Sequence, residues 1–88
     1  MANVRVQLDL SETRVRELEE LMELCGIATK KELLNNAITL FAWAVREVGK
    51  GNVIASVNEA EERYRELQMP ALSHAASARG DSEHLLAG

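Results

Sequence analysis

Three polar side chains alternate with apolar ones near the start of the chain. Arg5, Gln7 and Asp9 occupy every second position. The aliphatic residues around them are Val4, Val6, Leu8 and Leu10. Arginine offers a planar fork of donors, glutamine offers both donors and an acceptor, and aspartate is a charged acceptor. This set of groups is suited to recognition through hydrogen bonds.

No catalytic arrangement accompanies these residues. The sequence has no glycine-rich phosphate-binding loop, and no nucleophile is paired with a histidine in a segment that we expect to be ordered. The two histidines, His74 and His84, lack metal-ligand spacing. A chain of 88 residues is also too short to enclose a substrate pocket alone. We therefore expect no enzymatic activity, no cofactor and no metal.

The alternation between Val4 and Leu10 has a period of two, which predicts a half-buried β-strand. A lone strand cannot satisfy its own backbone donors and acceptors. No hairpin turn lies nearby to supply a partner, and the next segments are predicted to be helical. The same strand of a second chain is the simplest partner.

A first helix is predicted directly after this strand. Ser11 is a good N-cap, and Glu12 places negative charge in the first turn. Gly26 is placed to end the helix in a left-handed conformation. Apolar residues recur at helical spacing between these two ends, at Val15, Leu18, Met22 and Cys25.

A second helix is predicted from the capping box Thr29-Lys30-Lys31-Glu32 to about Val48, with Gly49 and Gly51 as stop signals. Its apolar residues cover more than one face, and a short monomer has little with which to cover two. A dimer can do so by packing the second helices together. The residues expected in the dimer core are Val6, Leu8, Leu34, Ile38, Phe41 and Val45.

The pattern changes after Gly51. The run 53–57 is β-like, 58–62 is turn-like and 63–67 suits a return strand, so we favour a β-hairpin. A helix over 58–67 is the alternative. Pro70 is expected to end regular structure. The predicted organisation is a main domain over residues 3–50, a C-terminal extension over 51–72 and a disordered tail over 73–88.

Composition and charge limit the function further. Hydrophobic residues make up 47% of the chain and aromatic residues only 3%. So small a domain usually needs a disulfide, a metal or a partner subunit, and with a single cysteine we expect the partner subunit. The net charge of −4 argues against a general nucleic-acid binder, and most of the acidic excess lies after residue 52. No signal or membrane-spanning segment is recognised, so a cytoplasmic location is expected.

A strand, a capped helix, a glycine turn and a second capped helix follow one another over residues 3–50. In this order and spacing the chain resembles the ribbon-helix-helix superfamily, the MetJ, Arc and CopG type of repressors and antitoxins, and is closest to the CopG type. The segments that carry the resemblance are residues 5–11, residues 26–32 and the apolar second helix. The resemblance implies a mainly α homodimer whose N-terminal strands form an intermolecular antiparallel β-ribbon.

The resemblance also implies roles for individual residues. The outward side chains of the ribbon enter the major groove of DNA in this family, and here they are Arg5, Gln7 and Asp9. Arginine can contact guanine, glutamine adenine, and aspartate cytosine N4. The start of the second helix clamps a phosphate, which here assigns Thr29, Lys30 and Lys31. Asp9 departs from expectation, because its charge repels nearby phosphates.

The predicted function is therefore sequence-specific DNA binding by a homodimeric transcriptional regulator. An antitoxin would combine this DNA module with a toxin-binding segment at residues 53–70. The alternative from another class is a dimeric protein-interaction module that keeps the fold and does not bind DNA. In that case the acidic C-terminal extension would be the working surface.

Overall fold

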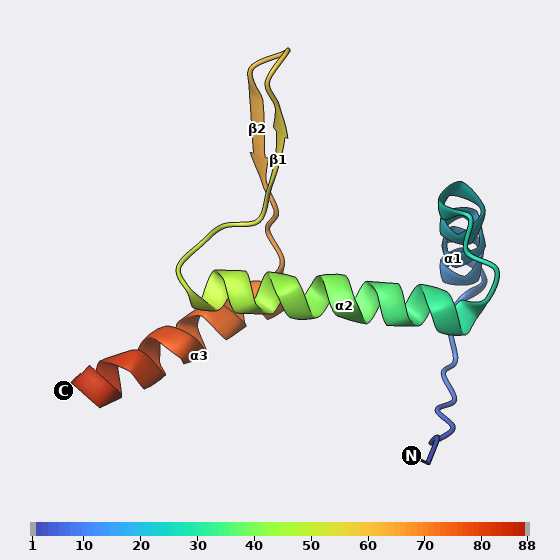
Figure 1. Ribbon diagram of the computed structural model, residues 1–88, viewed down its shortest axis with the longest axis horizontal. Helices are drawn as coiled ribbons and strands as arrows, with labels where there is room; N and C mark the ends of the chain where they lie inside the picture. Colours follow the sequence, from blue (N-terminus) through green and yellow to red (C-terminus); the bar gives the residue numbers. More distant parts are fainter. Residues whose placement is uncertain (1, 88) are drawn as a thin grey trace. The chain divides into compact units, whose positions relative to one another are not determined.

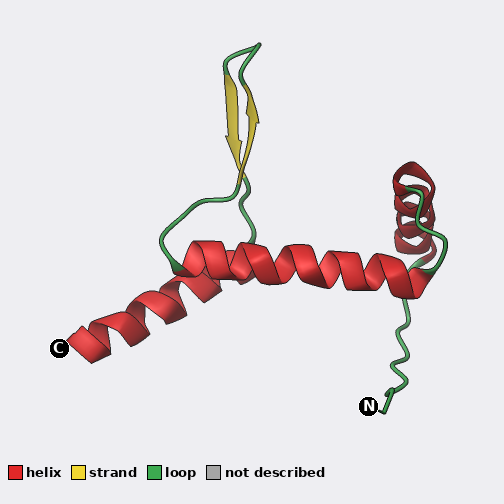
Figure 2. Ribbon diagram, in the orientation of Figure 1, coloured by secondary structure: helices red, strands yellow, loops and turns green. Residues whose placement is uncertain are grey.

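A computed structural model describes residues 2–87 of the chain, with side chains described for residues 2–78. Figure 1 shows the elements in order: α1 (Glu12–Cys25), α2 (Lys30–Gly49), β1 (Ala55–Asn58), β2 (Arg63–Glu66) and α3 (Pro70–Ala87). The fold is mainly helical, with the two strands paired as one antiparallel sheet (Figure 2). The chain divides into two units between Asn36 and Ala37, within α2.

Residues 2–11, before α1, form neither helix nor strand in the single chain. Its apolar residues are exposed, including Val6 at 71% and Leu8 at 67%. The N-terminal β-strand predicted from the alternation is therefore not present within one chain. A strand requires a neighbouring backbone to hydrogen-bond with, and no other segment of this unit supplies one. Pairing with a second chain stays a prediction.

Both ends of α1 have the caps that the sequence predicts. The Ser11 hydroxyl accepts a hydrogen bond from the backbone N–H of Arg14 at 3.2 Å. Gly26 has φ 65° and ψ 32°, the left-handed conformation that glycine adopts without a Cβ clash. The next N–H, that of Ile27, donates to the carbonyl of Met22 at 2.9 Å, which closes the last turn. These contacts confirm the predicted helix.

The cap predicted for α2 is also confirmed. The Thr29 hydroxyl accepts from the backbone N–H of Glu32 at 3.1 Å, and the Thr29 carbonyl accepts from the N–H of Leu33 at 3.1 Å. Gly49 is the last helical residue, and Gly51 follows with φ 91°. The predicted limits of the second helix are therefore correct to within one residue at each end.

Glu47 organises the chain as it leaves α2. Its backbone carbonyl accepts from the N–H groups of Lys50 and Asn52, at 3.1 and 3.0 Å. Its carboxylate accepts from the Lys50 ammonium at 3.2 Å and from the Asn52 amide at 3.1 Å. The hydrogen bond from Lys50, and then that from Asn52, lowers the pKa of Glu47 below its ordinary value. This interaction therefore stabilises the turn at neutral pH and disappears as the pH falls through the acid range.

Residues 55–66 form the predicted β-hairpin, so the alternative helix over 58–67 is wrong. The register pairs Val57 with Tyr64 and Ser56 with Arg65. Four residues, 59–62, form the loop. The Asn58 side-chain oxygen accepts from the N–H of Glu61 at 3.2 Å, as in a short capped turn. Helix-forming residues in the loop adopt a turn because this local hydrogen bond and the strand-forming Val57 and Tyr64 on either side favour a hairpin.

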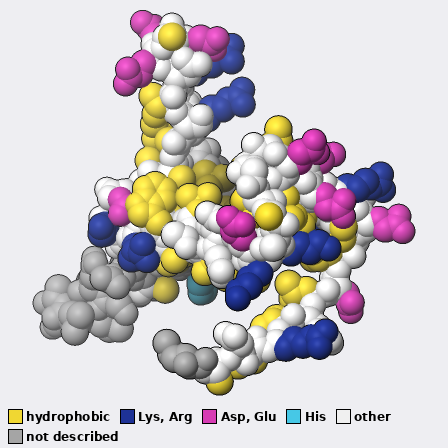
Figure 3. Space-filling model, turned by 45° about the vertical axis from the view of Figure 1, so that its right-hand side comes forward, with side chains coloured by type: hydrophobic (Ala, Val, Ile, Leu, Met, Phe, Trp, Pro, Cys, Tyr) yellow, Lys and Arg dark blue, Asp and Glu magenta, His cyan; other side chains and the backbone are white. Residues whose placement is uncertain are grey.

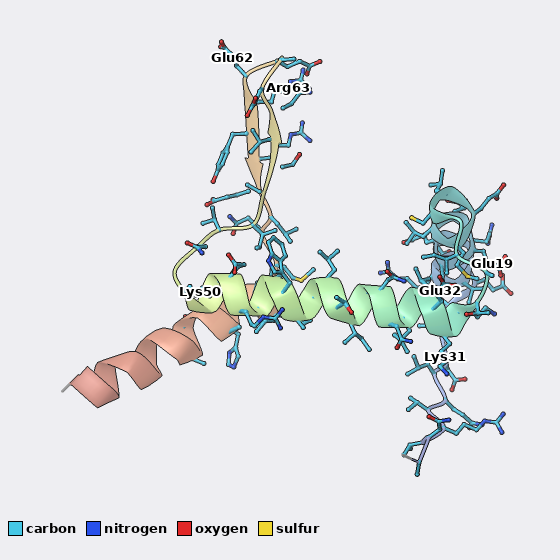
Figure 4. The ribbon with its side chains drawn as sticks, in the orientation of Figure 1. Glu19, Lys31, Glu32, Lys50, Glu62 and Arg63 are labelled. Carbon is cyan, nitrogen blue, oxygen red and sulfur yellow. The ribbon has the colours of Figure 1, made fainter. Side chains whose placement is uncertain are left out.

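Glu62, at the tip of the hairpin (Figure 4), has φ 55°. The left-handed conformation costs a residue with a side chain about 1 kcal/mol. Glu62→Gly should therefore stabilise the hairpin by a few tenths of a kcal/mol to about 1 kcal/mol. The measurement is hydrogen-exchange protection of the ladder amides of Ser56 and Arg65. Ala60→Gly, in the same loop without a positive φ, should lower protection; a gain from both variants would contradict the conformational explanation.

The C-terminal segment differs from the sequence prediction. Pro70 begins α3, so the prediction that it ends regular structure is wrong. Proline suits the first turn of a helix because its missing N–H has no partner there in any case. Where the sequence predicts a disordered tail over 73–88, the structure has helix through Ala87, and residue 88 lies outside the described residues. Alanine, a strong helix former, recurs through this segment.

Little of the chain is buried. Among the residues with described side chains, the buried apolar residues are Ala44 of α2 and Leu72 of α3, at 5% and 4% exposure. Large apolar side chains are exposed in both units, among them Val6, Ile38 and Val57. These side chains leave surface that a second polypeptide could cover.

Candidate nucleic-acid interface

The three predicted base-contacting residues lie in the segment before α1. Arg5, Gln7 and Asp9 are all exposed. Within the described part of the chain, none of their side chains takes part in a hydrogen bond or an ion pair. Their groups are therefore available to an external ligand, in contrast to Arg14, which pairs with Glu17 at 2.9 Å.

The predicted phosphate site lies at the start of α2. The cap uses the N–H of Glu32, and the helix uses that of Leu33. Over the described residues, the N–H groups of Lys30 and Lys31 have no hydrogen-bond acceptor. Helices leave their first N–H groups free in this way, and these groups together with the helix dipole attract anions. The start of α2 therefore presents two free backbone N–H groups, those of Lys30 and Lys31.

Charge at this site is mixed. The side chains of Lys30 and Lys31 are exposed and take part in no ion pair among the described residues. Glu32 follows them in the first turn of α2, close to Lys31 in sequence and in space (Figure 4). Its carboxylate stabilises the helix through the dipole and weakens the attraction for an anion. Two cations against one anion leave a modest local excess of positive charge.

Of the residues predicted for the dimer core, Val6 and Leu8 lie in the segment before α1, and the other four form one stripe along α2. Leu34, Ile38, Phe41 and Val45 are spaced by four, three and four residues, which places them on one face of a helix. Ile38 is 57% exposed and Phe41 is 43% exposed in the single chain. Figure 3 shows hydrophobic side chains open to solvent over the helices. Leu34, Ile38 and Phe41 of this stripe are therefore exposed, and Val45 is half-buried.

The hairpin holds a second set of polar groups that the sequence alone does not single out. The register places Arg63 and Arg65 on the same face as Ser56 and Asn58, because directly opposed residues share a face. In Figure 3 the hairpin carries arginine atoms along one side and hydrophobic atoms along the other. The period of two in residues 63–66 is the signal in the sequence, but the pairing register is needed to use it.

The acidic loop argues against a nucleic-acid role for this hairpin. Residues 59, 61 and 62 are glutamates. The guanidinium of Arg63 is paired with the carboxylate of Glu61 at 3.1 Å. The loop therefore offers repulsion to phosphates where a groove-binding arm would need attraction. Of the two polar segments, the N-terminal one is the better candidate.

Other kinds of site are not found in the part of the chain that the structure describes. No helix there is long and apolar enough to span a bilayer. No group of three or more histidine, cysteine, aspartate or glutamate residues there is placed to hold a metal ion. Comparison of the chain with protein-family models, with curated proteins and with solved structures found no match.

Proposed function

We propose that this chain works as a homodimeric, sequence-specific DNA-binding regulator of the ribbon-helix-helix type. Residues 4–10 of two copies would pair as an antiparallel ribbon with Arg5, Gln7 and Asp9 facing outward. The main support is the N-terminal segment itself, which alternates apolar and polar residues and pairs with no strand in the part of the chain that the structure describes. Helix caps at Ser11 and Thr29, where a ribbon-helix-helix unit requires them, add to this support.

The outward face would read bases directly. Arginine can donate two hydrogen bonds to guanine O6 and N7, and glutamine can bond to adenine N6 and N7. Asp9 can accept from cytosine N4 while it repels phosphates and other acceptors. Two-fold symmetry presents each residue twice, so the target would be a pair of related half-sites.

Contacts to the DNA backbone would set the position of the ribbon. The free N–H groups of Lys30 and Lys31 can hold one phosphate per chain, and the two ammonium groups add charge at the same place. Phosphate contacts of this kind orient a protein on DNA and carry no sequence information. Because the net charge is −4, these few contacts would support specific rather than general binding.

A protein-interaction module is the second candidate, and the hairpin is the observation that favours it. The hairpin is exposed, and its loop is acidic. A toxin-wrapping segment would be expected to order only on its target. Residues 55–66 are already paired in the single chain, which weakens the antitoxin form of this proposal.

Asp9→Asn separates the two candidates. Parent and variant are titrated side by side against a pool of random duplexes at low salt. If the ribbon lies in the groove, the variant should bind the whole pool more tightly, because a repulsive charge is removed without a change of shape. Glu23→Gln, which removes the same charge from α1 outside the proposed interface, is the matched control and should change binding less. No selection of sequence by the parent, together with no gain from Asp9→Asn, would replace the regulator by the interaction module.

A further inference from the structure

The two free edges of the hairpin differ in charge. From Gly51 to Asn58 the chain carries no charged side chain, so the β1 edge is neutral. The β2 edge carries charged side chains at Arg63, Arg65 and Glu66. Proteins usually protect exposed strand edges with charged residues, proline or a bulge. β2 has this protection, and β1 has none.

The backbone of β1 has groups available on that edge. The N–H of Leu67 donates to the carbonyl of Ile54 at 2.7 Å, so this opposed pair is hydrogen-bonded. Because inward and outward groups alternate along an antiparallel strand, Ser56 and Asn58 also bond inward to β2. The N–H and C=O groups of Ala55 and Val57 must then point away from β2, and within the described chain no other backbone group bonds to them.

The hairpin is also incomplete as a stable unit. Its strands contact each other and have little contact with the helices, and in Figure 1 its tip stands clear of α3 and of the C-terminal part of α2. Val57 and Tyr64, a directly opposed pair, are 61% and 60% exposed. A two-stranded hairpin alone is marginal in water, whereas three or more strands with an apolar face are stable.

We propose that β1 pairs edge to edge with β1 of a second copy of this chain, giving a four-stranded antiparallel sheet with β2 at each outer edge. A two-fold axis at Ser56 sets Ser56 opposite its own counterpart. The N–H and C=O groups of Ala55 then bond to those of Val57 in the other copy. By symmetry, the same two hydrogen bonds form between Val57 of the first copy and Ala55 of the second. This register uses both outward-facing residues of β1 and opposes no charges. It also brings the exposed Val57 and Tyr64 of each copy onto one face of the sheet.

The same operation fails at β2. The backbone groups of Tyr64 and Glu66 point away from β1. In a symmetric pair of β2 strands, Tyr64 must therefore lie opposite Tyr64 or Glu66 of the other copy, or Glu66 opposite Glu66. Every such register sets like charges directly opposite, either Arg65 against Arg65, Arg63 against Arg65, or Glu66 against Glu66. Opposed like charges destabilise a sheet. Assembly through β1 therefore stops at two hairpins. This pairing uses residues 54–67 alone and does not depend on DNA binding.

Disulfide formation tests the pairing in the full chain. Cys25 is exposed and is first replaced by serine. In that background, Ser56→Cys should cross-link two copies, because opposed residues at the axis lie at the separation that a disulfide requires. Arg65→Cys is the matched control. It is also exposed and lies on the same face, but in the proposed sheet two other strands separate it from its counterpart. The Ser56→Cys protein should cross-link on the order of tenfold faster or more.

Two further arms complete the experiment. Ala55→Pro removes an outward N–H and leaves the bonds to β2 intact, so adding it to Ser56→Cys should slow cross-linking roughly tenfold. Hydrogen exchange of the Arg65 amide verifies that the hairpin persists. Equal rates for Ser56→Cys and Arg65→Cys, or no effect of Ala55→Pro, would overturn the proposal. A mixture of Ser56→Cys and Arg65→Cys chains could instead cross-link faster than Ser56→Cys chains alone. That result would replace the proposal with open head-to-tail pairing, in which β1 of one copy pairs with β2 of the next.

Discussion

Phe41→Ala is expected to destabilise the folded protein by about 3–5 kcal/mol per chain, the usual cost of truncating a buried phenylalanine. In the single chain Phe41 is 43% exposed, so truncation there would cost much less. The full cost arises only if a second copy covers the stripe of Leu34, Ile38, Phe41 and Val45. Urea unfolding followed by circular dichroism, at one fixed protein concentration, measures the change.

Leu40→Ala is the matched control for this prediction. Leu40 lies on α2 next to Phe41 but about a third of a turn away from the stripe, and it is 64% exposed. Its truncation should cost far less than that of Phe41. If Phe41→Ala melts within a degree or two of the parent, Phe41 lies outside the dimer core and the assigned face of α2 is wrong.

Arg5→Ala is expected to weaken binding to the selected DNA sequence by roughly 1–3 kcal/mol for each bidentate arginine–guanine pair that it removes. In a dimer the substitution removes two such pairs. The variant should also accept more bases at the corresponding position of each half-site, because the arginine that selects guanine is absent. Fluorescence anisotropy titrations with the selected duplex and with a scrambled duplex measure both effects.

Lys30→Ala provides the contrast to Arg5→Ala. A phosphate contact is independent of sequence, so its removal should weaken binding to both duplexes alike and reduce the salt slope by about one charge per phosphate. The two substitutions should thus differ in how their effect on DNA binding depends on sequence, as well as in its size. An equal weakening on the selected and the scrambled duplex for Arg5→Ala would show that this residue does not read bases.

Local signals in the sequence predict the local structure well. The caps at Ser11 and Thr29 and the left-handed Gly26 mark the limits of α1 and α2, because each depends on a hydrogen bond within four residues along the chain. The hairpin loop is predictable for the same reason, through Asn58. In each case neither partner of the hydrogen bond depends on the rest of the fold.

Features that depend on distant or external partners are harder to predict. Residues 4–10 have the pattern of a strand, yet a strand forms only where another backbone is present. Proline is both a helix breaker and a good first residue of a helix, and Pro70 takes the second role. The basic face of Arg63 and Arg65 becomes visible only with the pairing register of the hairpin.

A second copy is expected to complete the fold. Over the described residues, the alternating N-terminal segment pairs with no strand, and Leu34, Ile38 and Phe41 of the apolar stripe of α2 are exposed. If both needs are met by dimerisation, folding and association are one process. The melting temperature must then rise with protein concentration, since mass action favours the associated state.

The most direct test measures molecular mass by light scattering and helical content by circular dichroism on the same samples, over a micromolar dilution series. We expect at least a dimeric mass wherever helical signal is retained, and a parallel decrease of both on dilution. A monomeric mass with undiminished helical signal at micromolar concentration would contradict coupled folding and dimerisation, because a single chain would then fold without the second copy.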